Sequence, residues 1–220
     1  MALALLRLNH MARVPRKSQI YDGESFHLFW KCHNNNFLLE DDYIKRYFYK
    51  LLLKYSQKYN VKIHSYSILS NHPHIFGTLG KLNLFSQFQR VTNSMLAKEI
   101  NENSSRVGQV VLDRYKIIPV REVEQQLSVM LYLDMNAVKA GLAGHPKYYK
   151  WSSYNYYAFG VHDPLLTPSP YYLALSGVQE KRMAIYRELI ECKLIELKKW
   201  NVAKKQSSRE DSNETLIKLL

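Results

Sequence analysis

The sequence has little cysteine, no long apolar run and fewer acidic than basic residues, and the first two shortages each exclude a class of protein. Cys32 and Cys192 are the only cysteines in 220 residues, too few and too far apart for a disulfide scaffold or a cysteine zinc site. No apolar run approaches the roughly 20 residues that span a bilayer, and the apolar start, Met1 to Leu6, is too short for the core of a signal peptide. We therefore expect a protein of the reducing cytoplasm.

The shortage of acidic residues leaves the chain strongly basic. Lysine and arginine number 31 against 19 aspartates and glutamates, which gives a formal net charge of +12. Such an excess suits a polyanionic partner, nucleic acid first and an anionic membrane surface less well. Seventeen tyrosines accompany the charge, and basic grooves with aromatic rings hold single strands through backbone charge and base stacking.

Hydrophobic periodicity predicts the order strand, helix, strand, strand, helix, strand, helix. The strands are expected at 26–32, 61–69, 72–78 and 114–120, and the helices at 41–58, 83–101 and 122–140. The compact arrangement for this order is an α+β fold, a ferredoxin-like βαββαβ antiparallel sheet with helices on one face.

The chain divides into four parts by composition. A basic arm is expected over residues 1–20 and the main domain over 21–160. A proline-containing linker and a C-terminal helix (178–200) occupy 161–200, and a polar, disordered tail is expected over 201–220.

Two histidines stand one residue apart in the segment Ser70-Asn71-His72-Pro73-His74. If they enter a strand, side-chain alternation turns both imidazoles to the same face. Two imidazoles can grip a divalent cation or hydrogen-bond a phosphate, but they make an incomplete metal site, and a chance pair at a strand end is the plain alternative. Pro73 is tolerable only because it lies at the start of the strand.

The helix expected at 122–140 has two distinct sides at 100° per residue. Its apolar residues should face the core: Val123, Leu127, Met130 and Val138. Its other side carries polar and aromatic residues: Gln125, Ser128, Tyr132, Asn136 and Lys139. Tyr132 and Asn136 are four residues apart and therefore neighbours on the helix surface.

Four segments together resemble the IS200-like tyrosine transposases, including the REP-associated type, in the HUH endonuclease superfamily. The segment from Ser70 to His74 looks like the family's PNHxH signature, and Arg114-Tyr115-Lys116 matches its basic-aromatic segment. Residues 132–141 resemble YxxxNPVRAG, and residues 151–154 match WSSY. The resemblance runs from about residue 11 to residue 191. Pro73 and Ala137 depart from the usual pattern, and Pro73 puts the angle between the two imidazoles in question.

The resemblance implies an enzyme that nicks and rejoins single-stranded DNA during transposition, on hairpin or repeat DNA. Tyr132 would be the nucleophile and form a 5′-phosphotyrosine, with His72 and His74 as catalytic metal ligands and Asn136 as the third ligand. An amide oxygen in the ligand set favours Mg²⁺ or Mn²⁺ over Zn²⁺, although two imidazoles can also hold a softer ion. Relatives work both as monomers and as homodimers.

Two alternatives stay open at this point. One is a non-catalytic protein, derived from a transposase, that binds structured DNA, and the other is a metal-dependent nuclease in which Tyr132 only stacks on a base. The candidate DNA contacts are Lys31, Arg114, Lys116 and Lys139, and each is equally well explained as a solubilising surface charge.

Overall fold

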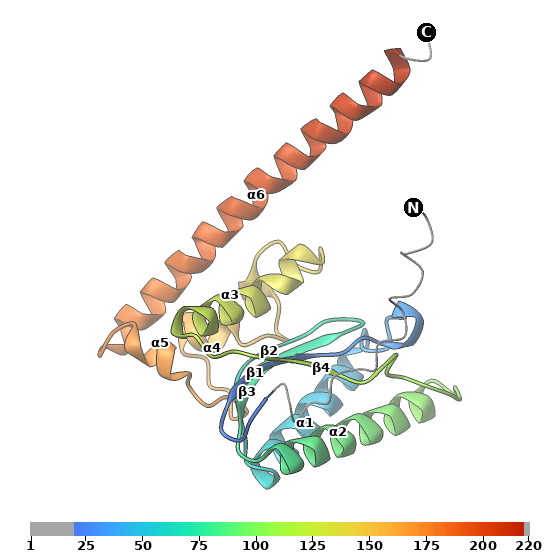
Figure 1. The fold of residues 1–220 in the computed structure, drawn as a ribbon, viewed down its shortest axis with the longest axis vertical. Coiled ribbons are helices and arrows are strands. Elements are labelled where there is room, and N and C mark those ends of the chain that lie inside the picture. Colours follow the sequence, from blue (N-terminus) through green and yellow to red (C-terminus); the bar gives the residue numbers. More distant parts are fainter. Residues whose placement is uncertain (1–19, 218–220) are drawn as a thin grey trace, which may run out of the picture.

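The computed structural model describes residues 20–217 of the chain (Figure 1). The basic arm predicted over residues 1–20 therefore lies outside the described residues, apart from Ile20. Within the described part, no helix has the length and apolar character needed to cross a membrane.

A four-stranded antiparallel sheet forms the centre of the molecule. Its strands are β1 (Ser25–Phe29), β2 (Val61–Ile68), β3 (Pro73–Leu79) and β4 (Lys116–Pro119). They lie in the order β2-β3-β1-β4, and all neighbours are antiparallel. This is the order of a ferredoxin-like sheet, which confirms the predicted fold class.

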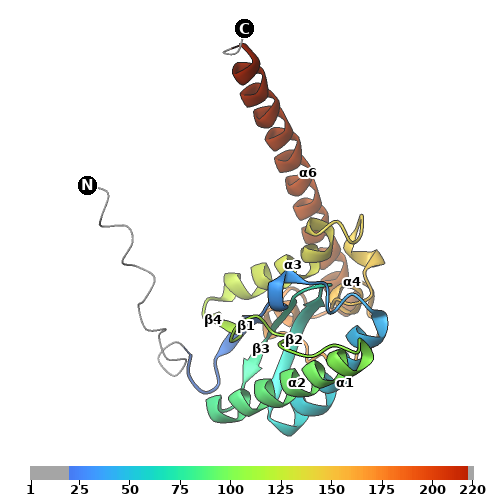
Figure 2. The ribbon, with the colours of Figure 1, turned by 90° about the vertical axis from the view of Figure 1, so that its right-hand side faces the viewer.

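The two crossover helices, α1 (Asp42–Lys58) and α2 (Leu82–Asn103), cover one face of the sheet, as Figure 2 shows. The Asp41 carboxylate caps α1 by accepting the Tyr43 backbone N–H at 2.7 Å, a favoured arrangement for an unpaired N-terminal donor. Phe26 of β1 meets Phe85 of α2 with ring centroids 4.7 Å apart. The main apolar core therefore lies between this face and these two helices.

The opposite face of the sheet is covered by α3 (Val123–Lys139). Side chains alternate along β1, so His27 and Phe29 point away from the core residues Phe26 and Leu28 and toward α3. Tyr132 of α3 lies edge-on to His27 with ring centroids 5.9 Å apart. This second face is polar where the first is apolar, and the candidate site lies on it.

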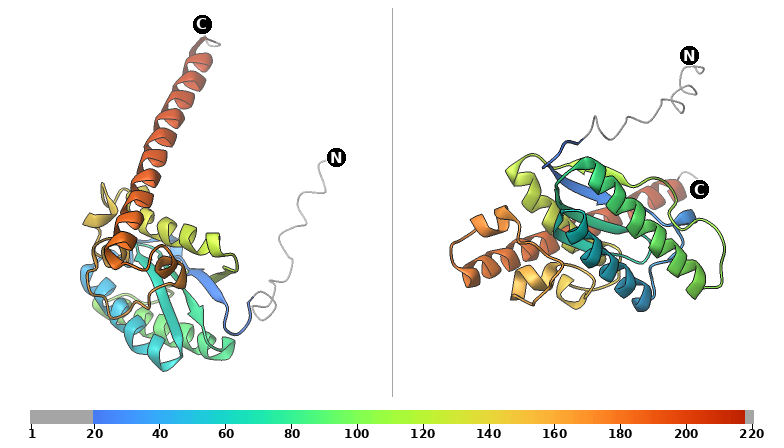
Figure 3. Two further views of the ribbon diagram at one scale, coloured as in Figure 1. Left: turned by 90° about the vertical axis from the view of Figure 1, so that its left-hand side faces the viewer. Right: turned by 90° about the horizontal axis from the view of Figure 1, so that it is seen from below.

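Four short helical segments flank these layers: η3 (His33–Asn35), η4 (Pro146–Tyr148), α4 (Tyr154–Phe159) and α5 (Pro170–Ala174). The segment predicted as a linker thus contains one short helix, α5. The last helix, α6 (Gln179–Ile217), packs on α3 and α4 and then projects beyond the domain (Figures 1 and 3).

The prediction of a disordered tail over 201–220 is wrong up to Ile217, because α6 continues through that residue. The prediction relied on the polar, charged composition of this segment. The segment up to Ile217 contains no glycine or proline, and a helix that has already formed can extend through polar residues because extension avoids the cost of nucleation.

Candidate active site

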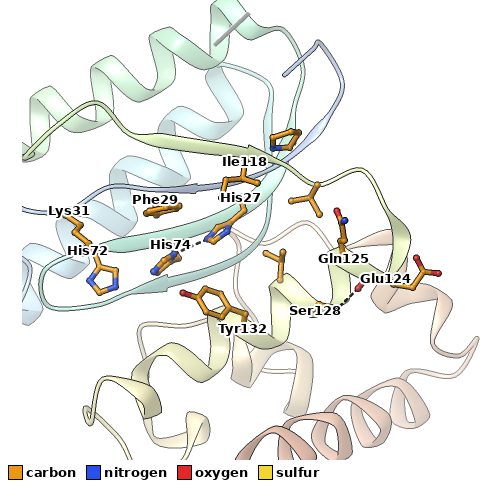
Figure 4. A pocket seen from close by; sticks show the side chains of 13 residues that line it. His27, Phe29, Lys31, His72, His74, Ile118, Glu124, Gln125, Ser128 and Tyr132 are labelled. Carbon is orange, nitrogen blue, oxygen red and sulfur yellow. Dashed lines mark hydrogen bonds between the residues drawn. The ribbon is translucent and has the colours of Figure 1, made fainter. Parts of the chain in front are cut away.

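Three histidines, one more than the sequence indicated, gather on the α3 side of the sheet (Figure 4). His74 is the second residue of β3, and His72 lies in the turn before it, because the strand begins at Pro73. The third, His27, comes from the neighbouring strand β1. The rings of His72 and His74 lie 5.0 Å apart between centroids at 77° to each other, so Pro73 leaves both rings at one cleft.

Each histidine of the sequence motif has one ring nitrogen held by the protein. Asn71 Oδ1 accepts a hydrogen bond from His72 Nδ1 at 2.5 Å, and the same amide donates from Nδ2 to the backbone carbonyl of Asn35 at 3.4 Å. An amide oxygen can only accept, so neutral His72 carries its proton on Nδ1 and keeps the Nε2 lone pair free. His74 Nδ1 lies 3.0 Å from His27 Nε2 and shares a hydrogen bond with it. The other ring nitrogen of His74, Nε2, takes no part in this hydrogen bond.

Burial keeps all three imidazoles in their neutral form. It lowers the pKa of His74 to about 3 and that of His27 to about 4. The pKa of His72 is also lowered, first by burial and then by the charge of Lys31. Neutral imidazole is the form that ligates metal ions, so the two motif histidines fit a divalent cation in protonation state as well as in position.

Tyr132 is the side chain of α3 that His27 and His74 face. Its ring stands at 90° to that of His74 with centroids 5.7 Å apart, and the side chain is 42% exposed. Lys139, two turns along α3, places its Nζ 4.6 Å from the centroid of the Tyr132 ring. A lysine over a tyrosine face is a cation–π contact.

The histidines and Tyr132 line one open cleft of about 930 Å³ between the sheet and the first turns of α3. Phe29 and Lys31 of the β1 side also line it, as do Gln125 and Ser128 of α3 (Figure 4). The cleft is wide enough for a nucleotide and carries a lysine at one end, which suits an anionic substrate.

The helical wheel predicted that Asn136 shares the exposed side of α3 with Tyr132, and this prediction is wrong. Asn136 is only 6% exposed. Its Nδ2 is buried and has no hydrogen-bond partner, and an unsatisfied buried amide is costly. Among residues 20–217, no three His, Cys, Asp or Glu side chains form a metal cluster. An amide oxygen is a chemically suitable third ligand for a hard divalent ion, and the Asn136 amide lies one turn along α3 from Tyr132.

The four predicted DNA contacts occupy different places. Lys31 lines the cleft, and Lys139 lies over Tyr132. Lys116 is exposed on β4 with its Nζ 5.8 Å from the centroid of the Phe29 ring, beside the cleft. Arg114 is exposed but does not line the cleft.

A buried carboxylate holds α3 in place. Asp134 is fully buried and accepts hydrogen bonds from Tyr186 of α6 at 2.7 Å and from Ser153 at 3.0 Å. Burial raises its pKa to about 7, and the two hydrogen bonds counteract part of that shift. Ser153 belongs to the WSSY segment, so this segment supports the tyrosine helix from beneath. Sequence reasoning missed Asp134 because a carboxylate inside a helix normally marks an exposed side.

The model of the IS200-like transposase family matches residues 21–135, more than half of the chain, and includes His72, His74 and Tyr132. The chain therefore belongs to the IS200-like transposase family and has a transposase-type function on DNA.

A solved structure supports the fold. A REP-associated tyrosine transposase bound to a REP hairpin superposes with a TM-score of 0.54 at 18% identity, over 72% of this chain and 93% of that one. A putative transposase from Deinococcus radiodurans R1 is less similar, with a TM-score of 0.39 at 12% identity over 56% of this chain and 96% of that one. No curated protein matches the sequence.

Proposed function

We propose that the protein nicks and rejoins single-stranded DNA, with Tyr132 as the nucleophile and a 5′-phosphotyrosine intermediate. The observation that carries the proposal is the placement of an exposed phenol against two neutral histidines, with centroids of Tyr132 and His74 5.7 Å apart. Hairpin DNA is the proposed substrate, because the REP-associated relative with the same fold is described as bound to a REP hairpin.

In the forward step the Tyr132 oxygen attacks the scissile phosphorus and loses its proton. The P–O bond to the 3′ oxygen breaks, and this oxygen takes up a proton to leave as a 3′-hydroxyl. The phosphodiester energy stays in the tyrosyl ester, so a second 3′-hydroxyl can reverse the reaction on another strand. The Lys139 ammonium lies over the Tyr132 ring, where it offers a positive charge to a phosphate bound at the phenol.

Mg²⁺ or Mn²⁺, held by His72, His74 and Asn136, would polarise the scissile phosphate and offset its charge. Other side chains would assist at this site. Asn71 orients the imidazole of His72, and His27 orients that of His74. Lys31 offers a phosphate contact at the end of the cleft. A hydrogen bond to the ring nitrogen that does not bind the metal fixes the tautomer and direction of a metal-binding histidine.

The experiment is incubation of labelled single-stranded hairpin DNA with the protein and Mn²⁺, followed by denaturing electrophoresis. We expect a covalent protein–DNA adduct and a free 3′-hydroxyl fragment, both lost in Tyr132→Phe. Tyr148→Phe is the matched control, because Tyr148 is 72% exposed and lies outside the cleft. Cleavage that survives in Tyr132→Phe would instead show a plain nuclease, and binding without cleavage would show a DNA-binding protein.

A further inference from the structure

A second hollow lies on the other side of Tyr132 from the histidines. It is a groove of about 900 Å³ between α3 and α6. Leu131, Tyr132 and Lys139 line it from α3, and Lys193, Leu197 and Trp200 line it from α6. Tyr132 and Ser128 line both hollows, so the tyrosine forms part of the ridge between the histidine cleft and this groove.

The groove has an aromatic platform at its outer edge. Trp200 is 59% exposed although its neighbours Leu194 and Leu197 pack toward the core. Lys204 places its Nζ 5.1 Å from the centroid of the Trp200 ring. An exposed indole with a lysine beside it, on a helix that projects past the domain, is suited to base stacking next to a phosphate backbone.

The charge of the groove also suits a nucleotide. Lys139 and Lys193 enter it from opposite helices, and burial together with the charge of Lys193 lowers the pKa of Lys139. Two ammonium groups that repel one another leave a place for an anion between them. Glu196 is the acidic side chain in the lining, and Lys193 already pairs with it at 2.8 Å.

We propose that this groove binds the nucleotide that adjoins the scissile phosphate, with its base stacked on Trp200 and its phosphate near Lys139 and Lys193. A strand whose phosphate lies at Tyr132 must continue on both sides of the ridge, and the histidine cleft takes only one of them. The inference rests on the proposed function, since it assumes that Tyr132 receives a DNA strand.

The test measures equilibrium binding in the full chain carrying Tyr132→Phe, which retains the ring and does not cleave. The probes are a DNA hairpin with a short single-stranded extension and the same hairpin without it. We expect Trp200→Ala to weaken binding of the extended hairpin about 5- to 150-fold, the range for one stacked base. Binding of the blunt hairpin should not change. Trp200→Phe should retain most of the affinity, and Val202→Ala, an exposed neighbour outside the groove, should retain all of it.

An abasic site in the extension provides the matching change on the DNA. One abasic position should reproduce the loss in the parent protein and cause no further loss in Trp200→Ala. Equal weakening of both hairpins, or no weakening at all, overturns the proposal. The proposal is also overturned if sedimentation shows that the parent protein is a dimer and that Trp200→Ala converts it to a monomer. In that case a second copy of the chain, and not DNA, would occupy the groove.

The two proposals fail separately in these experiments. If Tyr132 forms a covalent adduct but Trp200→Ala has no effect on binding, the proposal for the groove is refuted and the proposal for the nucleophile stands. If Trp200 contributes to binding of the extended hairpin but no adduct forms, the proposal for the nucleophile is refuted and the groove remains a binding site for the extension.

Discussion

Replacement of His27 tests whether the buried histidine pair prepares His74 for a metal ion. His27 and His74 are 9% and 5% exposed, and their ring nitrogens lie 3.0 Å apart. His27→Leu retains much of the volume and removes the hydrogen bond, so His74 can rotate and its Nδ1 loses its partner. Loss of such a supporting contact weakens metal binding by about 10- to 100-fold, or roughly 1.4–2.7 kcal/mol.

The assay is titration of Mn²⁺ into the DNA-free protein by calorimetry, with circular dichroism to verify the fold. His27→Gln can restore a hydrogen bond to His74 Nδ1, so we expect its affinity to lie between those of His27→Leu and the parent. His162→Ala is the control, because His162 is exposed and lies away from the cleft. If His27→Leu binds Mn²⁺ as tightly as the parent while His74→Ala does not, the supporting role of His27 is refuted.

Two further predictions follow from buried and exposed charges. The native pKa of Asp134 is raised from 3.8 to about 7 by burial, so the native state binds more protons than the unfolded state in this range and stability falls as pH rises through it. As pH rises from about 4 to 7, the unfolding free energy of the parent should fall by up to roughly 4 kcal/mol relative to that of Asp134→Asn. Urea titration at several pH values measures both free energies. A difference between the two proteins that does not change with pH would contradict the prediction. Lys31→Ala should lower the salt slope of DNA binding by about one, whereas Arg114→Ala, outside the cleft, should not, and the reverse result would relocate the DNA path.

The element order could be predicted because each element carries a clear period. Along α1, for example, apolar residues recur at helical spacing, and Ile44, Phe48, Leu51 and Leu52 are all buried. His27 could not be assigned to the site in the same way, because its partner His74 is 47 residues away and the pairing of β1 with β3 brings them together. The available signal was weak: alternation places His27 on the opposite face of β1 from the core residues Phe26 and Leu28.

The error on α3 has a physical origin in its second covered side. A helical wheel assumes one buried side and one solvated side, but α3 has the sheet on one side and α6 on another. Asn136 and Asp134 are consequently buried, while Tyr132 stays exposed in the gap between the two layers. The sequence shows the amphipathic stripe of each helix but not that a later helix will cover the remaining side.

Three of the four segments that resemble the family serve two different physical purposes. His72, His74 and Tyr132 face the cleft, where a strand and a cation can meet them. The WSSY segment lies behind α3, where Ser153 donates to Asp134, the carboxylate that Tyr186 of α6 also binds. One buried group thus joins the tyrosine helix to the helix that carries Trp200. A displacement of α6 would act on the histidine cleft and on the groove together, because Tyr132 is part of the wall of both.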